Sequence, residues 1–161
     1  IGVSSAADAM TVSSAGIVTF KDDILIKDGG TIGVASDADV ITIASTGVTT
    51  FSKAVVGKSD TDTSNSGSVT LDFQANQNFI LTLTGNVTLA NPSTEAVGQT
   101  GVIVCIQDGT GSRTLSLGTD YETAGGAGIT LSTAASAVDV IPYFVKASGS
   151  IQLGAPQLAF S

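Results

Sequence analysis

The chain has 161 residues, of which 42% are apolar and only 12% are charged, and its net charge is −8. Disorder needs low hydrophobicity together with high charge, so this composition predicts an ordered protein. A negative surface repels a polyanion, so we expect no nucleic-acid partner. No apolar run approaches the ~20 residues that cross a bilayer, and no membrane insertion is expected. The chain begins at Ile1, which indicates a processed product or a fragment of a longer polypeptide.

The residue types favour strands and tight turns. There are 19 glycines, and Ser, Thr and Ala take the place of the Leu, Glu and Lys that dominate helical proteins. No window carries apolar residues at a sustained helical spacing. We therefore predict an all-β fold without a helix longer than about two turns, and a strong helical double minimum in circular dichroism would contradict it.

Residues that usually carry catalysis are scarce. The sequence has no His, which excludes His-dependent triads and His metal sites. Cys105 lies in an apolar run, residues 101–106, and is expected to be a small buried hydrophobe. Glycosidases use paired carboxylates in a cleft lined with aromatics, whereas this chain has no Trp and two tyrosines, Tyr121 and Tyr143. We expect no enzyme activity, and we assign no catalytic, cofactor-binding or metal-binding residue.

The first third of the chain is an internal repeat. Residues 1–20 align without gaps on residues 32–51, an offset of 31 residues that matches Gly16 with Gly47 and Phe20 with Phe51. Apolar residues alternate within each copy and the glycines fall where a turn is needed, so each copy predicts a strand, a turn and a strand. A decayed third copy after Phe51 is suggested by residues 55–58.

One such unit buries too little apolar surface to fold alone. Three chains wrapped around one axis would remove exposed strand edges and would bury between them Phe20, Ile24, Ile26 and Phe51. We therefore predict that residues 1–56 form a shaft-like β-repeat region within a homotrimer.

Residues 57–68 are nearly free of apolar groups and predict a linker. Residues 60–67 place oxygen ligands at alternate positions, as a calcium loop does, but Asn65 and Leu71 replace the Gly and Glu that such a loop needs. We favour a solvated linker, and expect cleavage within residues 60–66 to release a stable C-terminal fragment.

Residues 69–161 predict a separate domain of about eight short antiparallel strands, a β-sandwich of jelly-roll type. Within it, residues 101–107 read as a central strand buried on both faces. Gly85-Asn86 is expected to turn the chain back. Pro142 predicts an edge strand or a bulge.

Residues 108–112 predict a hairpin loop leading into the next strand. The loop lacks the Gly-Lys-Ser/Thr ending of a phosphate-binding loop and precedes a strand, so Arg113 is expected to pair with a nearby carboxylate. Asp22-Asp23 and Asp37-Ala-Asp39 could recruit a cation if they faced a three-fold axis, but turn caps facing solvent are favoured.

The C-terminal half resembles a domain at the distal end of tail-fibre and other virion structural proteins of tailed bacteriophages. The resemblance covers about the last 90 residues, and the repeat resembles fibre-shaft sequence. The motifs that carry the resemblance are 71–73, 78–79, 81–86, 89–92, 98–101, 107–113 and 137–140, with Tyr143 and Val145-Lys146. The resemblance implies a trimeric shaft and tip in the virion tail, with other virion proteins as partners. It also implies contact with a host surface glycan or protein, although no receptor-binding residue can be assigned.

Two other functions remain open. A monomeric glycan-binding adhesin or S-layer-like module could use the same sandwich, and a capsid decoration protein could clip onto a capsid lattice. Oligomeric state separates them, since a fibre is expected to be a trimer and an adhesin module a monomer.

Overall fold

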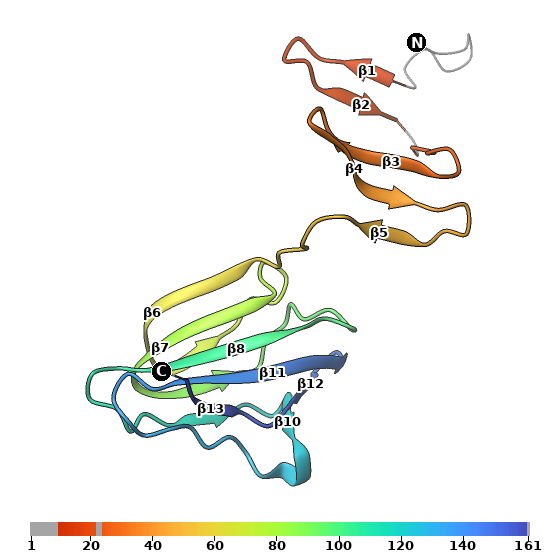
Figure 1. The fold of residues 1–161 in the computed structure, drawn as a ribbon. Coiled ribbons are helices and arrows are strands. Elements are labelled where there is room, and N and C mark those ends of the chain that lie inside the picture. Colours follow the sequence, from red (N-terminus) through yellow and green to blue (C-terminus); the bar gives the residue numbers. More distant parts are fainter. Residues whose placement is uncertain (1–9, 22–23, 161) are drawn as a thin grey trace. The chain divides into compact units, whose positions relative to one another are not determined.

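The computed structural model describes residues 10–21 and 24–160, and the chain divides into two compact units, Ile1–Val55 and Val56–Ser161 (Figure 1). The predicted all-β class is confirmed, because the only helical segment in the described part is a single 3-10 turn, Ala124–Gly126. No helix among these residues is long and apolar enough to span a membrane.

The first unit consists of a two-stranded hairpin and a three-stranded sheet. Their strands are β1 (Met10–Val12), β2 (Val18–Phe20), β3 (Gly30–Val34), β4 (Asp37–Ile43) and β5 (Thr49–Phe51). Met10 pairs with Phe20 in the first hairpin as Ile41 pairs with Phe51 in the second, at the offset of the sequence repeat. The prediction of one hairpin in each copy is confirmed.

The two hairpins have the same type of turn. The amide of Gly16 donates to the carbonyl of Ser13, and that of Gly47 donates to Ala44, both at 2.9 Å. Both glycines have a positive φ, 76° and 83°, which an L-residue with a side chain rarely adopts. This is a type I turn closed by a left-handed residue, a common three-residue hairpin loop, and it explains why glycine recurs in the repeat.

Around Phe20 and Phe51, each sheet of the first unit has apolar residues on one side and threonines on the other. Ile32, Ile41 and Phe51 are aligned across β3, β4 and β5, and the next row, Thr31, Thr42 and Thr50, points to the opposite side. The first hairpin repeats the pattern, with Met10 opposite Phe20 and Thr11 opposite Thr19. We call the sides that carry Phe20 and Phe51 the repeat faces.

The decayed third copy forms no further hairpin. Residues 52–58 belong to no strand, and the chain enters the second unit directly.

The second unit is built on an eight-stranded sheet. Its strands are β6 (Ser59–Thr70), β7 (Asn78–Ala90), β8 (Thr100–Gln107), β9 (Leu115–Leu117), β10 (Tyr121–Thr123), β11 (Val138–Ala147), β12 (Ser150–Leu153) and β13 (Gln157–Phe160). The main path runs in the order β10-β12-β11-β8-β7-β6. Strands β6, β7, β8 and β11 lie side by side (Figure 1).

The predicted linker over residues 57–68 is wrong, because Ser59–Thr70 forms strand β6, which pairs with β7. β6 lies at the edge of the sheet, and nearly all of its side chains are exposed. Polar side chains on an edge strand protect a sheet from pairing with strands of other proteins. The same polar composition is typical of a loop, which is why the sequence predicted a linker here. Cleavage at residues 60–66 would therefore cut the domain, and a stable fragment is expected to begin near Val56.

Antiparallel pairing is confirmed for the joins of β11 to β8, β12 and β13. The expectation of an entirely antiparallel jelly roll is wrong, since β7 runs parallel to β6, β8 and β9, and β10 runs parallel to β12. Gly85-Asn86 does not turn the chain back but lies inside β7, at a register shift against β6. Residues 108–112 do not form a hairpin loop, because β8 and β9 follow each other along the same side of β7 in the same direction.

Pro142 lies in a central strand and not at an edge. β11 is flanked by β8 on one side, and on the other side by β12 along residues 143–147 and β13 along residues 138–140. The carbonyl of Pro142 accepts from Gly154 on this second side, so its nitrogen points there too. Pro142 therefore lies between the stretches of β11 that pair with β13 and with β12, where no neighbouring strand needs an N–H donor.

One apolar core fills the second unit. Its most deeply buried members are Phe79, Leu83, Leu89, Ile103, Ile141, Val145 and Ile151. Phe73, Phe79 and Tyr143 contact one another, with ring centroids 5.0, 5.2 and 6.4 Å apart. The predicted burial of Cys105 is confirmed, since its side chain joins this core.

Candidate interaction surfaces

The repeat faces are exposed in the single chain. Phe20 is 44% and Phe51 is 51% exposed, and no apolar side chain in the described part of the first unit is buried. An apolar area of this kind on a soluble protein marks an interaction surface. Burial of both phenylalanines between chains stays a prediction.

A second surface is polar and lies on the second unit. Residues 108–113 follow β8, residues 132–137 precede β11, and backbone hydrogen bonds connect the two loops. Ser112 donates to the carbonyl of Thr133 at 2.9 Å, and Ser136 donates to that of Asp108 at 3.0 Å. We call these two segments the loop pair. Thr110, Ser112, Thr133 and Ser136 are exposed on it.

Two serines of the loop pair have a strained backbone. Ser112 and Ser136 both have a φ of 61°, in the left-handed region where residues other than glycine are uncommon. Gly111, the residue before Ser112, leaves no room for a side chain, because a Cβ there would lie 2.5 Å from the carbonyl oxygen of Thr133. Strained residues of this kind concentrate at ligand-binding sites and persist only where their surroundings hold them.

Buried polar side chains hold the loops in place. Gln107 is 2% exposed, donates to the carbonyls of Arg113 and Ser132 at 2.9 Å, and accepts from the amide of Arg113 at 2.8 Å. Asp139 is 1% exposed and accepts from the amide and hydroxyl of Ser132, each at 2.7 Å, and from the amide of Ala159. Such saturated networks rigidify the segments they join.

An ion pair closes the first loop, so the expectation that Arg113 pairs with a nearby carboxylate is confirmed. Arg113 Nη2 lies 2.7 Å from Asp108 Oδ2, and Nε donates to the same oxygen at 3.1 Å. The amides of Thr110 and Gly111 donate to Oδ1. These hydrogen bonds, with that from Arg113 the largest, lower the pKa of Asp108 from its usual 3.8 to about 2.

We predict that Arg113→Gln raises the pKa of Asp108 toward 3.8, since the guanidinium is the main cause of its lowering. Because the pKa of Asp108 is lower in the folded state, its ionised carboxylate stabilises the fold. This contribution to the free energy of unfolding is complete above the unfolded pKa, near 4, and is lost as the pH falls through about 2. Carboxyl carbon NMR during an acid titration measures this. Arg113→Lys keeps the charge without the planar fork and should give an intermediate value. A wild-type titration near pH 4 would contradict the ion pair.

The cysteine is not placed for chemistry. Cys105 is 1% exposed, and burial, with the nearby Asp139 carboxylate, raises its pKa to about 12. The thiol is therefore protonated at neutral pH, and a protonated buried thiol is inert. We predict that a thiol reagent at pH 8 labels Cys105 only after urea unfolds the protein. Labelling of the native protein at the rate of a free thiol would contradict this.

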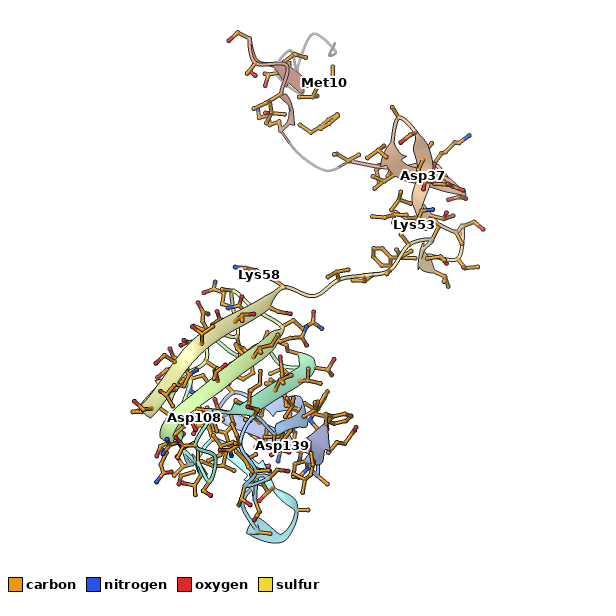
Figure 2. The ribbon with its side chains drawn as sticks, turned by 60° about the vertical axis from the view of Figure 1, so that its left-hand side comes forward. Met10, Asp37, Lys53, Lys58, Asp108 and Asp139 are labelled. Atoms are coloured by element: carbon orange, nitrogen blue, oxygen red, sulfur yellow. The ribbon has the colours of Figure 1, made fainter. Side chains whose placement is uncertain are left out.

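The structure describes some of the acidic residues singled out in the sequence. Asp37 pairs with Lys53 at 3.0 Å (Figure 2), which the sequence did not indicate. Asp22 and Asp23 lie outside the described residues. Residues 60–67 extend along β6, so they are not a loop. In the part of the chain that the structure describes, no three acidic or thiol side chains are grouped to hold a metal ion.

Several residues of the sequence resemblance have structural roles. Tyr143 donates to the carbonyl of Gln77 at 2.6 Å, and Gln99 donates to the carbonyls of Phe73 and Asn76. Gly101 leaves room for these contacts, since a Cβ there would overlap the Gln77 carbonyl. These motifs therefore contribute to the packing of the domain.

A shallow groove of about 700 Å³ lies elsewhere on the second unit. It is lined by Leu115, Leu117, Tyr121, Glu122, Gly126 and Ile129, among others. It presents a single carboxylate, and its one aromatic ring is buried, so it lacks both the paired acids and the stacking surface of a glycosidase cleft.

Comparison with known protein families finds a match to the second unit. Residues 63–150 match the family model described as "Putative phage tail fibre C-terminal domain". The match covers more than half of the chain and includes β7, β8, β11 and the loop pair. Neither the comparison with curated proteins nor that with solved structures found a match.

Proposed function

Because the chain belongs to the phage tail fibre C-terminal domain family and is a component of the virion tail, we propose that it forms a homotrimeric β-rod and tip that contacts the host surface. The family match supports association with other virion proteins. Its role is structural and adhesive, not enzymatic, which agrees with the absence of His from the sequence.

The proposed homotrimer rests on the exposure of the repeat faces in the single chain. The described part of the first unit contains two phenylalanines and several branched aliphatic residues, yet none of them is buried. Ordering a segment costs conformational entropy that only burial of apolar surface offsets. Copies of the same chain supply identical faces at identical positions, and three copies around one axis bury all of them without leaving an open end.

The loop pair supports the adhesive half of the proposal. Its exposed hydroxyl groups can exchange hydrogen bonds with sugar hydroxyls, and the buried anchors Gln107 and Asp139 keep it ordered before contact. Preorganisation of this kind lowers the entropic cost of binding.

Sedimentation equilibrium of the full chain tests assembly. The proposal expects three times the single-chain mass of 15.9 kDa at micromolar concentration. A monodisperse monomer would contradict it and favour the monomeric adhesin or S-layer-like module. A monomer that binds only to an assembled capsid would favour a decoration protein.

An array of bacterial cell-surface polysaccharides tests contact. The trimer is expected to bind at least one polysaccharide, and Thr110→Arg, on the loop pair, is expected to weaken that binding at least tenfold. Thr88→Arg, on an exposed part of β7, is the control and should bind as the wild type does. Equal binding by both variants would remove the loop pair from the proposal.

A further inference from the structure

The sheet of the second unit has an apolar side that the single chain does not cover. Along β7, β8 and β11 alternate residues point into the core, such as Phe79, Ile103 and Ile141, and their neighbours point out. Six of the outward neighbours, most of them on β8 and β11, are also apolar, and they are only half-buried. We call them the outer apolar face: Ile80, Val102, Val104, Ile106, Val138 and Val140.

The members of this face are aligned across the strands. Val104 of β8 pairs with Ile80 of β7 on one side and with Val140 of β11 on the other. In the next row Val138 lies between Ile106 and Phe160, which is 47% exposed. Branched side chains in register across neighbouring strands form a continuous surface.

The same side of β7 is polar farther along the strand. Where β9 replaces β8 as the neighbour of β7, the outward row consists of Ser68, Thr88 and Ser116, all exposed. A sheet that has water on one side alternates apolar and polar residues, and this half of the strand does so. On β7 itself Ile80 lies between the polar Asn78 and Thr82 on this side, whereas on β8 and β11 successive outward residues are apolar, as in a sheet that is covered on both sides.

Charge is confined to the margin of the face. None of its six residues is charged, in a chain whose net charge is −8. Lys146 and Glu122 pair at 3.2 Å at one end, on the outward side beside Phe144. An apolar centre with a polar rim is the usual anatomy of a protein interface.

We propose that the outer apolar face is the surface through which the second units of copies of this chain pack against one another. The inference rests on the proposed homotrimer. Chains joined through their repeat faces hold their second units at high effective concentration, so a modest apolar area is enough for association. A charged face would repel its own copy in a protein this acidic, whereas a neutral one does not.

Val104→Lys in the full chain tests the proposal, because Val104 is central to the face and points out of the fold. The variant is expected to dissociate, on dilution in sedimentation equilibrium, at a concentration at least tenfold higher than the wild type. Its tyrosine near-ultraviolet circular dichroism should be unchanged, since both tyrosines lie in the core and the lysine does not. Thr88→Lys, on the polar half of the same side, is the matched control and should assemble as the wild type does.

Thiol labelling gives a second measurement that does not depend on a charged variant. Cys105 is buried, so the thiol introduced by Val104→Cys can be followed against that introduced by Thr88→Cys. In the assembled protein the thiol at position 104 is expected to react at least tenfold more slowly than the thiol at position 88, and this difference should shrink once the chains are separated. Equal labelling rates of the two introduced thiols within a stable trimer would overturn the outer-face proposal but not the proposed homotrimer. The face would then be free to contact another virion protein.

Slow labelling combined with unchanged association of Val104→Lys would also overturn the proposal, because the face would then be covered from within its own chain. A wild-type monomer would instead overturn the proposed function itself, so the two failures are distinguishable.

Discussion

Phe79→Ala is expected to lower the free energy of unfolding of the second unit by about 4 kcal/mol, within the range for truncating a buried phenylalanine. Phe79 is fully buried, and its ring centroid lies 5.0 Å from that of Phe73 and 6.4 Å from that of Tyr143. The resulting cavity would lie between β7 and the segment that crosses from β6, so collapse of the backbone could fill little of it.

Urea unfolding followed by tyrosine fluorescence measures this loss. Both tyrosines, Tyr121 and Tyr143, lie in the second unit, and the chain has no Trp, so the signal reports that unit alone. Val97→Ala, at a position that is 67% exposed, is the control and should change the free energy by less than about 0.5 kcal/mol. Similar midpoints for the two variants would show that the aromatic cluster does not stabilise the domain.

Phe51→Ala is expected to destabilise the assembled protein by about 3 kcal/mol per chain, because a phenylalanine in an interchain core loses both its burial and its packing. In a lone chain, where its side chain is 51% exposed, the same truncation would cost far less. The size of the effect therefore reports burial between chains. Because each trimer contains three copies, the concentration at which it dissociates should rise steeply.

Thr50→Ala is the matched control, since Thr50 is the neighbour of Phe51 in β5 and lies on the opposite side of the sheet. Sedimentation equilibrium at a series of dilutions compares the two variants. If both assemble as the wild type does, the repeat faces are not the interchain core. Phe20→Ala should behave as Phe51→Ala does, because the two residues have equivalent partners in their hairpins.

Local patterns predicted local structure well. The repeat revealed both hairpins, because alternation and a glycine at the turn act over a few neighbouring residues. The apolar run around Cys105 correctly indicated a central strand. In the structure this strand, β8, lies between β7 and β11. Burial on both faces was predicted for it, and the single chain covers one of them.

Residues distant in sequence decided what the local patterns missed. The tail of polar residues before Val69 forms an edge strand only because β7 offers it a partner, and nothing in its own composition distinguishes it from a loop. The loop pair depends on hydrogen bonds between residues more than twenty positions apart. Its signal in the sequence was the polar Gln107 at the end of an apolar strand, a residue that has to find partners when it is buried.

The sequence by itself determined that this protein is made of strands, that its first third repeats, that it carries no histidine chemistry and that it resembles a tail fibre. These properties depend on composition and on spacing along the chain, which folding does not change. The tertiary structure alone decided the parallel order of β6, β7, β8 and β9, the closure of the loop pair and the division of the sheet's outer side into polar and apolar halves. Each of these depends on which strand lies beside which, and that choice is set by the packing of a shared core and not by any short stretch of residues.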